Sequence, residues 1–170
     1  MSKPTLEVRN PDDSEVDQIA QVWYDGWQDA HAALMPETLT HARTLDSFRE
    51  RIRAGLSRVR VVGSLGKPVG FYMLKGEELD QLFVAAEARG TGVAAALIDD
   101  AEAMLARNNV ETAWLACAIG NHRAAKFYEK CGWRLTGNVV VKLDIPGGQF
   151  PLEVWRFEKP LAPWGQRAPG

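Results

Sequence analysis

Residues Leu79 to Ala94 read LDQLFVAAEARGTGVA and join a strand pattern to the start of a glycine-bearing helix. Because Gly90 and Gly92 carry no Cβ, the backbone there can turn tightly and present successive N–H groups. The positive end of the following helix dipole points the same way. The segment therefore predicts a binding site for an anionic group such as a pyrophosphate.

The same glycines also match the dinucleotide fingerprint G-x-G-x-x-G/A through Gly90, Gly92 and Ala95. That fingerprint places its first glycine directly after a strand, and an acidic residue about 20 positions later at the end of the next strand. Here an intervening segment separates the strand from Gly90, and Glu111 precedes the next apolar run instead of following it. The spacing disfavours a nucleotide-dependent oxidoreductase.

Between Arg89 and Ala94 the sequence also fits the acyl-CoA motif R/Q-x-x-G-x-G/A, and the chain resembles the GNAT superfamily of N-acetyltransferases. A second segment, NHRAAKFYEKCGW at residues 121–133, is similar to the N-x-x-A-x-x-F-Y-x-x-x-G-[FW] pattern of that family. The resemblance covers Leu6 to Lys159. It departs from the family at Ala86, where many relatives carry proline.

The composition is that of one globular domain. The chain has 170 residues, of which 46% are hydrophobic, and we expect a single domain at 1–159 followed by a flexible tail rich in Pro and Gly at 160–170. A net charge of -2 supplies no global basic field for nucleic acid or for an anionic membrane, so neither is an expected partner. We interpret one local run of arginines as solvated surface. It comprises Arg49, Arg51, Arg53, Arg58 and Arg60.

Cysteine and histidine spacing indicates neither a metal site nor a disulfide framework. The two cysteines, Cys117 and Cys131, form no CxxC pair, and the three histidines are scattered. The N-terminus is polar, and no apolar run approaches the roughly 18 residues of a membrane span. We therefore expect a cytoplasmic protein without a metal.

Hydrophobic spacing predicts a mixed order of strands and helices. Strands are expected at 6–9, 58–62, 69–74, 79–84, 112–118, 135–143 and 152–157. Helices are expected between Val16 and Pro36, within 39–56, from Thr91 to Arg107, and after Asn121. The resemblance implies an α/β (α+β) fold with a mixed, mostly antiparallel twisted sheet flanked by helices. It also implies that the parallel strands 79–84 and 112–118 splay apart and hold the CoA.

The resemblance implies acetyl-CoA as acyl donor. The strand before the loop would hydrogen-bond the pantetheine amides as if the cofactor were an extra strand, and the loop would hold the pyrophosphate. Asn121 is equally a good helix N-cap. The implied cofactor contacts are Leu82, Phe83, Val84, Arg89, Gly90, Thr91, Gly92, Val93, Ala94 and Asn121.

Aminolysis of a thioester expels a thiolate, so an acid near the sulfur and a base near the amine both aid it. The resemblance implies Tyr128 as the acid, since a phenol has a pKa of about 10. Glu78 and Asp80 alternate onto one strand face, and either is a candidate base, with Glu78 preferred. Proton relay through water or a backbone carbonyl is the alternative.

The expected acceptor contacts are Trp27 and His31 on the first helix. Packing of this helix on the sheet would by itself also place large side chains four residues apart on one helix face. The resemblance implies transfer to a primary amine of a small molecule or peptide by direct attack in a ternary complex. The alternative is a non-catalytic acyl-CoA-binding regulatory module. Because many relatives pair through their C-terminal strands, a homodimer is expected, with Trp155 and Phe157 as its apolar surface.

Overall fold

The computed structural model describes residues 6–163, and its strands form one sheet in the order β1-β2-β3-β4-β5-β7-β6. Neighbouring strands are antiparallel except β4 and β5, which are parallel. This confirms the expected mixed, mostly antiparallel sheet. The strands are β1 (Val8–Arg9), β2 (Val59–Ser64), β3 (Lys67–Lys75), β4 (Glu78–Val84), β5 (Thr112–Ala118), β6 (Arg134–Ile145) and β7 (Gly148–Pro160).

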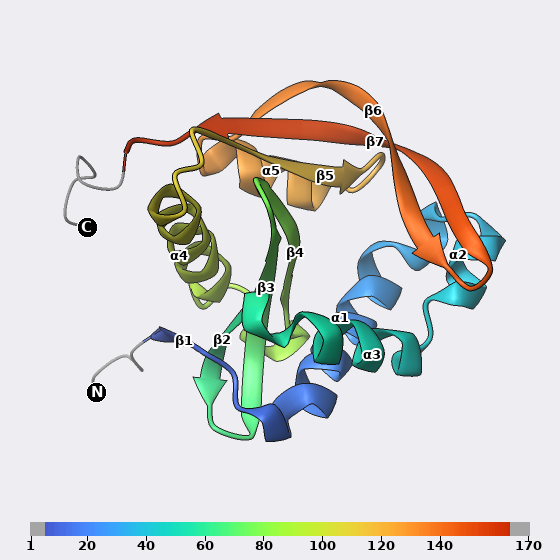
Figure 1. Cartoon of the computed structure of the whole chain (residues 1–170), viewed down its shortest axis with the longest axis horizontal. Coiled ribbons are helices and arrows are strands. Elements are labelled where there is room, and N and C mark those ends of the chain that lie inside the picture. Colours follow the sequence, from blue (N-terminus) through green and yellow to red (C-terminus); the bar gives the residue numbers. More distant parts are fainter. Residues whose placement is uncertain (1–5, 164–170) are drawn as a thin grey trace.

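The helices flank this sheet on both faces (Figure 1). They are α1 (Val16–Ala30), α2 (Glu37–Ala42), α3 (Leu45–Gly55), α4 (Val93–Arg107) and α5 (His122–Lys130). The first helix is shorter than expected, because a separate turn of 3-10 helix at Ala32–Leu34 follows it. The single helix expected within 39–56 is in fact two helices, because the extended Thr44 interrupts it and caps α3 by accepting a hydrogen bond from the Ser47 N–H.

Two apolar cores hold the helices to the sheet. On one face, α1 and α3 pack on β3 through fully buried Trp23, Phe48 and Phe71. On the other face, α4 packs through Leu97 and its neighbours into a core that also takes up side chains of β5, β7 and α5. The part of the sheet that contains β2, β3 and β4 is therefore packed on both faces.

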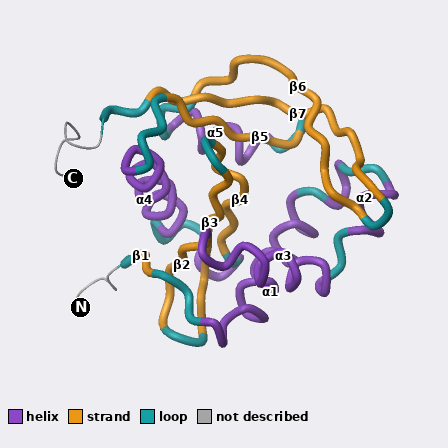
Figure 2. Tube along the Cα trace, in the orientation of Figure 1, coloured by secondary structure: helices purple, strands orange, loops and turns teal. Residues whose placement is uncertain are grey.

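The long β6–β7 hairpin arches from α5 across to α2 (Figure 2). Both strands extend further than the sequence pattern predicted, and the hairpin is tied to α2 where Arg43 donates from Nη1 to the Asp144 carbonyl at 2.8 Å. Phe157 is fully buried in the α4 core, so the expectation that it offers an apolar dimer surface is wrong. Only Trp155 of that pair is partly exposed, and it packs on His122.

The two ends of the domain are tied back by hydrogen bonds. Near the N-terminus, the predicted cap Asp12 forms a capping box with Glu15. At the other end, the Leu161 N–H donates to the Glu111 carbonyl at 2.8 Å, which places the start of the expected tail against the sheet. Residues 164–170 lie outside the described part of the chain. Within 6–163 no helix has the length and apolar character needed to cross a membrane.

Candidate active site

The parallel strands β4 and β5 touch at one end and separate toward the other. Their register contains the pair Glu78 and Trp114, and the Trp114 N–H donates to the Glu77 carbonyl at 3.3 Å. Beyond that point, within the described residues, no register pair joins the strands on the way to Val84 and Ala118. The predicted splay is therefore present, and cavities open on both sides of it.

The first cavity, of about 450 Å³, lies between the far halves of β4 and β5 and the starts of α4 and α5. It brings together the predicted phosphate loop, the strand leading into it and Tyr128. Of the expected cofactor contacts, Thr91 alone is not among its lining residues, because its hydroxyl turns back and donates to the Ala88 carbonyl. The predicted residues that line it are Leu82, Phe83, Val84, Arg89, Gly90, Gly92, Val93, Ala94, Asn121 and Tyr128.

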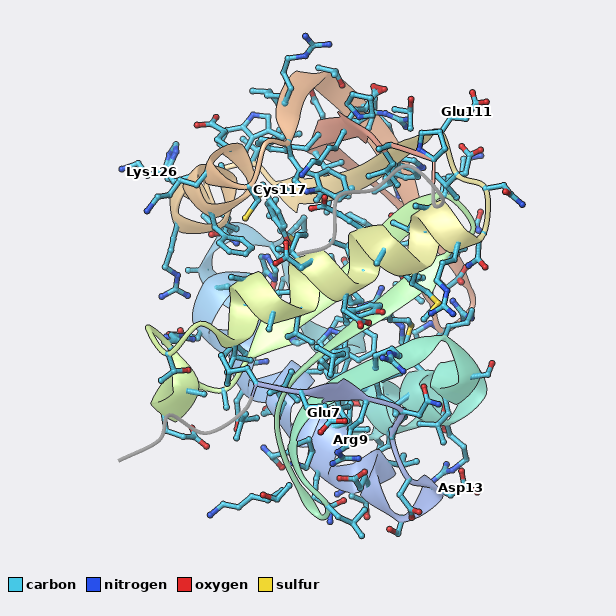
Figure 3. The ribbon with its side chains drawn as sticks, turned by 90° about the vertical axis from the view of Figure 1, so that its left-hand side faces the viewer. Glu7, Arg9, Asp13, Glu111, Cys117 and Lys126 are labelled. Carbon is cyan, nitrogen blue, oxygen red and sulfur yellow. The ribbon has the colours of Figure 1, made fainter. Side chains whose placement is uncertain are left out.

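The loop before α4 has the backbone conformation that its glycines predicted. Gly90 and Gly92 have φ angles of 78° and 91°, a region that other residues adopt only with strain. Gly92 is the N-cap of α4 and offers no side-chain cap, so the first-turn N–H groups of this helix have no side-chain acceptor within residues 6–163. Figure 3 looks onto α4, with Cys117 of β5 and Lys126 of α5 toward its N-terminal end. These N–H groups and the helix dipole suit an anion.

Basic side chains stand at the rim of the first cavity. Arg89 forms an ion pair with Asp29 of α1 at 2.6 Å, and Arg123 lies 3.6 Å from the same carboxylate. The hydrogen bond from Arg89 lowers the pKa of Asp29. Arg123 was not singled out from the sequence, because its position in the second motif carries no fixed residue type. One acid therefore holds two guanidinium groups beside the loop.

The second cavity, of about 490 Å³, lies on the other side of the splay, between α1, the end of α2, and the β6–β7 hairpin. It contains the predicted acceptor contacts Trp27 and His31 and both candidate bases, Glu78 and Asp80. The two cavities meet in the gap between β4 and β5. They share the lining residues His31, Asp80, Gln81, Ala116 and Ala118.

A β-bulge at Asp80 sets which side chains of β4 face the second cavity. The pairing of β3 with β4 shifts so that Met73 opposes Gln81 while Leu74 opposes Leu79, which leaves Asp80 without a partner. After the bulge the alternation is reversed, and Gln81 joins Glu78 and Asp80 in lining the cavity. Sequence alternation alone did not indicate Gln81, because nothing in the local sequence marks the extra residue.

The two carboxyl groups lie in a poorly solvated part of the site. Burial, together with the smaller effect of the neighbouring charge of Asp80, raises the pKa of Glu78 to about 7. Burial also raises the pKa of Asp80, against the opposing effect of Arg51 and other nearby cations. A carboxyl group with a pKa near neutral suits proton abstraction from an amine.

Tyr128 is packed at the inner end of the first cavity. Its ring lies among Phe127, Trp133 and Phe157 at centroid distances of 5.4 to 6.3 Å. Burial raises the pKa of the phenol well above its usual value, so the hydroxyl stays protonated at neutral pH. Its side chain forms no hydrogen bond within residues 6–163, which leaves the hydroxyl available to a bound molecule.

His31 and Asn121 join the two halves of the site across the gap. Asn121 caps α5 by accepting the Ala124 N–H at Oδ1, as predicted, so its Nδ2 is the group that lies 3.3 Å from His31 Nε2. Since Nδ2 can only donate, the Nε2 atom accepts and the proton lies on Nδ1. Burial lowers the pKa of His31 to about 4, so the ring is neutral.

The interpretation of the arginine run as solvated surface is wrong for Arg51. Its guanidinium stacks 4.4 Å above the Trp23 ring and lines the second cavity. Arg43, which the sequence did not single out, lines the same cavity and is only 6% exposed. Neither position could be recognised from the sequence, because both depend on how α2 and α3 meet the β6–β7 hairpin.

Comparisons with known proteins agree with this geometry. A family model described as an acetyltransferase (GNAT) domain matches residues 15–150. The peptidyl-lysine N-acetyltransferase YjaB of Escherichia coli is 28% identical over 152 residues, which cover 86% of this chain and 93% of the relative.

Solved structures share the fold. A GCN5-related N-acetyltransferase from Rhodopseudomonas palustris has a TM-score of 0.71 at 23% identity, over 95% of this chain and 99% of the other. The PaiA N-acetyltransferase of Thermoplasma acidophilum, solved in complex with coenzyme A, has a TM-score of 0.70 at 16% identity, over 92% of this chain and 99% of the other.

Proposed function

Because the chain belongs to the GNAT family of N-acetyltransferases, we propose that it transfers the acetyl group of acetyl-CoA to the side-chain amine of a lysine in a peptide or protein. The observation that carries this proposal is the meeting of two cavities in the gap between β4 and β5. A donor in the first cavity and an acceptor in the second would face each other there. The lysine acceptor is suggested by the relative in Escherichia coli, which is named a peptidyl-lysine N-acetyltransferase.

The first cavity fits acetyl-CoA in two respects. The loop at Gly90 and Gly92 presents backbone N–H groups at the start of α4, which suits a pyrophosphate. Residues 82–84 pair with β3 on one side, and their other edge faces the gap, which suits the amides of pantetheine. When bound, acetyl-CoA would supply the electrophilic thioester carbonyl.

Proton transfers in this proposal use groups on both sides of the gap. Glu78 or Asp80 accepts the proton that the acceptor ammonium loses, either directly or through a water. The amine nitrogen then forms the new C–N bond as the C–S bond breaks, and Tyr128 donates its proton to the departing sulfur. The second proton that the nitrogen loses as it becomes an amide restores the phenol of Tyr128. The raised pKa of Tyr128 keeps that proton on the phenol until the thiolate forms.

No covalent enzyme intermediate is part of this mechanism. Cys117 lines the first cavity, but burial raises the pKa of its thiol to about 11. Its Sγ lies 3.8 Å from the Ala118 and Asn121 carbonyl oxygens. A carbonyl oxygen can accept a hydrogen bond from the thiol, but it is too weak a base to deprotonate it. A neutral thiol is a poor nucleophile, so direct attack by the amine is favoured.

The test is an acetylation assay with purified protein, acetyl-CoA and a blocked peptide that contains one lysine. We expect release of free CoA thiol together with a peptide whose mass has increased by one acetyl group. The same peptide with arginine in place of lysine is the control and should stay unmodified. If acetyl-CoA binds but no lysine peptide and no small amine is acetylated, the chain is instead a non-catalytic acyl-CoA-binding module.

A further inference from the structure

The second cavity carries more positive than negative charge. Four cationic side chains line it, against the two carboxyl groups of Glu78 and Asp80. Such an excess is unexpected if the cavity receives only an ammonium group, because like charges repel. The four cations are Arg43, Arg51, Lys75 and Lys142.

Arg51 is the most informative of these cations. It stacks on the face of Trp23 at 4.4 Å, and it forms neither an ion pair nor a hydrogen bond within residues 6–163. Asp80 exerts an electrostatic attraction on it, while Arg43 repels it, and burial is the main reason that its pKa falls to about 10. A guanidinium group that is partly removed from water and has no carboxylate partner loses part of its hydration, and a bound anion would offset that loss.

Arg43 lies in the same cavity with only 6% of its surface exposed. Its Nη1 donates to the Asp144 carbonyl at 2.8 Å, which fixes the side chain but does not neutralise its charge. Burial lowers its pKa, against the attraction of Asp144 and Asp80. A guanidinium has five N–H donors, so the contact with Asp144 leaves others for a ligand.

Two further donors in this cavity lack acceptors. The indole N–H of Trp23 is buried and has no hydrogen-bond partner in the described part of the chain. The same is true of His31 Nδ1, which carries the proton when Nε2 accepts from Asn121. Both residues line the second cavity. Buried polar groups normally have partners, so these two unpaired donors add to the positive potential of the cavity wall, which favours an anionic occupant over a cationic one.

From these four residues we infer that the second cavity contains a carboxylate-binding subsite, so that the preferred acceptor amine carries a carboxylate group of its own. Arg51 and Arg43 bind that carboxylate, and the amine lies toward Glu78 and Asp80. This inference rests on the proposed function and narrows its substrate class. The carboxylate belongs either to a free amino acid or to an acidic residue beside the acceptor lysine, and both sources present the same group to the guanidinium pair.

The experiment compares matched acceptors that differ in one charge. In the first arm, ε-aminocaproate is compared with its neutral amide. In the second arm, blocked peptides with one lysine flanked by glutamate are compared with the same peptides flanked by glutamine. We expect the carboxylate forms to have a kcat/KM about 10- to 100-fold higher, mainly through KM, as suits a charge-assisted pair of hydrogen bonds. The arm with the larger ratio identifies the source.

Variants assign the effect to Arg51. Arg51→Gln should reduce the preference for the carboxylate form, measured as the ratio of its kcat/KM to that of the neutral amide, to within about threefold. Arg51→Lys keeps a positive charge and should retain part of the preference, which separates lost charge from lost packing. The matched control is Arg53→Gln on the exposed side of the same helix, which should keep the full preference. Thermal unfolding of each variant checks that it is folded.

The outcomes separate this inference from the proposed function. Equal kcat/KM for charged and neutral acceptors in both arms would overturn the subsite and leave the acetyltransferase function standing. If no acceptor is acetylated, the proposed function fails, and calorimetric titration with ε-aminocaproate and its amide then decides the subsite alone. Binding of the carboxylate form that Arg51→Gln abolishes would support it, and equal or absent binding of both forms would refute it.

Discussion

Glu78 of β4 lies opposite Trp114 of β5 in the register pair where these parallel strands meet before they diverge. The carboxyl group therefore stands at the closed end of the splay, and Arg156, which stacks 4.3 Å above the Trp114 ring, attracts it from β7. This position explains why the Glu78 side chain is poorly solvated and why its pKa rises. At this position Glu78 lines the second cavity and does not line the first.

If Glu78 is the base, activity should depend on its deprotonation. A carboxylate accepts a proton only when it is ionised, so kcat/KM should rise with pH through about 7, the pKa of Glu78. Glu78→Gln should lower kcat/KM at pH 8 by about 10²- to 10⁴-fold. Because the acceptor amine also titrates, with a pKa of about 10.4 for lysine, the informative quantity is the ratio of wild-type to variant rates across the pH range.

The control for this profile is Glu77→Gln, which changes an exposed neighbouring carboxylate and should leave the profile as in the wild type. An unchanged rate in Glu78→Gln, together with a loss in Asp80→Asn, would transfer the role of base to Asp80. Unchanged rates in both variants would leave water or a backbone carbonyl as the route for the proton.

Gly90→Asp should weaken acetyl-CoA binding. Gly90 has a φ of 78° and no neighbouring atom within 4 Å of an added Cβ, so the side chain would project into space without steric conflict and place a negative charge beside the phosphate loop. We expect Kd for acetyl-CoA to rise by at least about tenfold, measured by calorimetric titration. Gly147→Asp, in the β6–β7 turn with a φ of 87° and equally open surroundings, imposes the same backbone strain and should leave Kd unchanged.

Tyr128→Phe should separate chemistry from binding. Removing the hydroxyl deprives the departing thiolate of its proton donor, and kcat should fall by about 10²- to 10⁴-fold. Kd for acetyl-CoA should stay within about twofold, because the ring and its packing remain. Tyr24→Phe on α1, which lines neither cavity, should change neither quantity. A wild-type kcat in Tyr128→Phe would exclude the phenol as the acid.

Glu15 should control acid stability. It is fully buried, accepts hydrogen bonds from Arg9 and from the Asp12 and Gly66 N–H groups, and its pKa falls to about 2, mainly through the bond from Arg9. A pKa lower in the folded than in the unfolded state adds stability above pH 4.5, the ordinary value for Glu, and that stability is lost as the pH falls toward 2.

Glu15→Gln is therefore expected to lower the free energy of unfolding by about 2–4 kcal/mol at pH 7, measured by denaturant titration. The difference in unfolding free energy between the variant and the wild type should shrink as the pH approaches 2, because the wild-type carboxyl group then becomes protonated and is uncharged like the glutamine amide. Glu50→Gln, on the exposed side of α3, serves as the control and should be neutral. A constant difference at all pH values would mean that the charge of Glu15 does not contribute.

For several residues, tertiary contacts produce an environment that differs from the one predicted from the sequence. Phe157 looked like a dimer surface and is core, and Arg51 looked solvated and lines a cavity. An aromatic residue in an alternating strand has the same local pattern whether its face meets solvent or a helix. Trp27 likewise packs in the core and also lines the second cavity. Helical periodicity cannot distinguish these two roles, because both require an apolar side chain on the same face of the helix.

The strand, the glycine loop at Gly90 and Gly92 and the helix after it could all be predicted from the sequence, because positive φ angles, a strand period and helix capping are local properties of the backbone. Two ordered motifs also indicated the family. The point where β4 and β5 separate, the bulge at Asp80 and the approach of Arg43 to Arg51 in the second cavity became visible in the folded chain. Those features depend on contacts between segments far apart in the chain, and no local propensity encodes them.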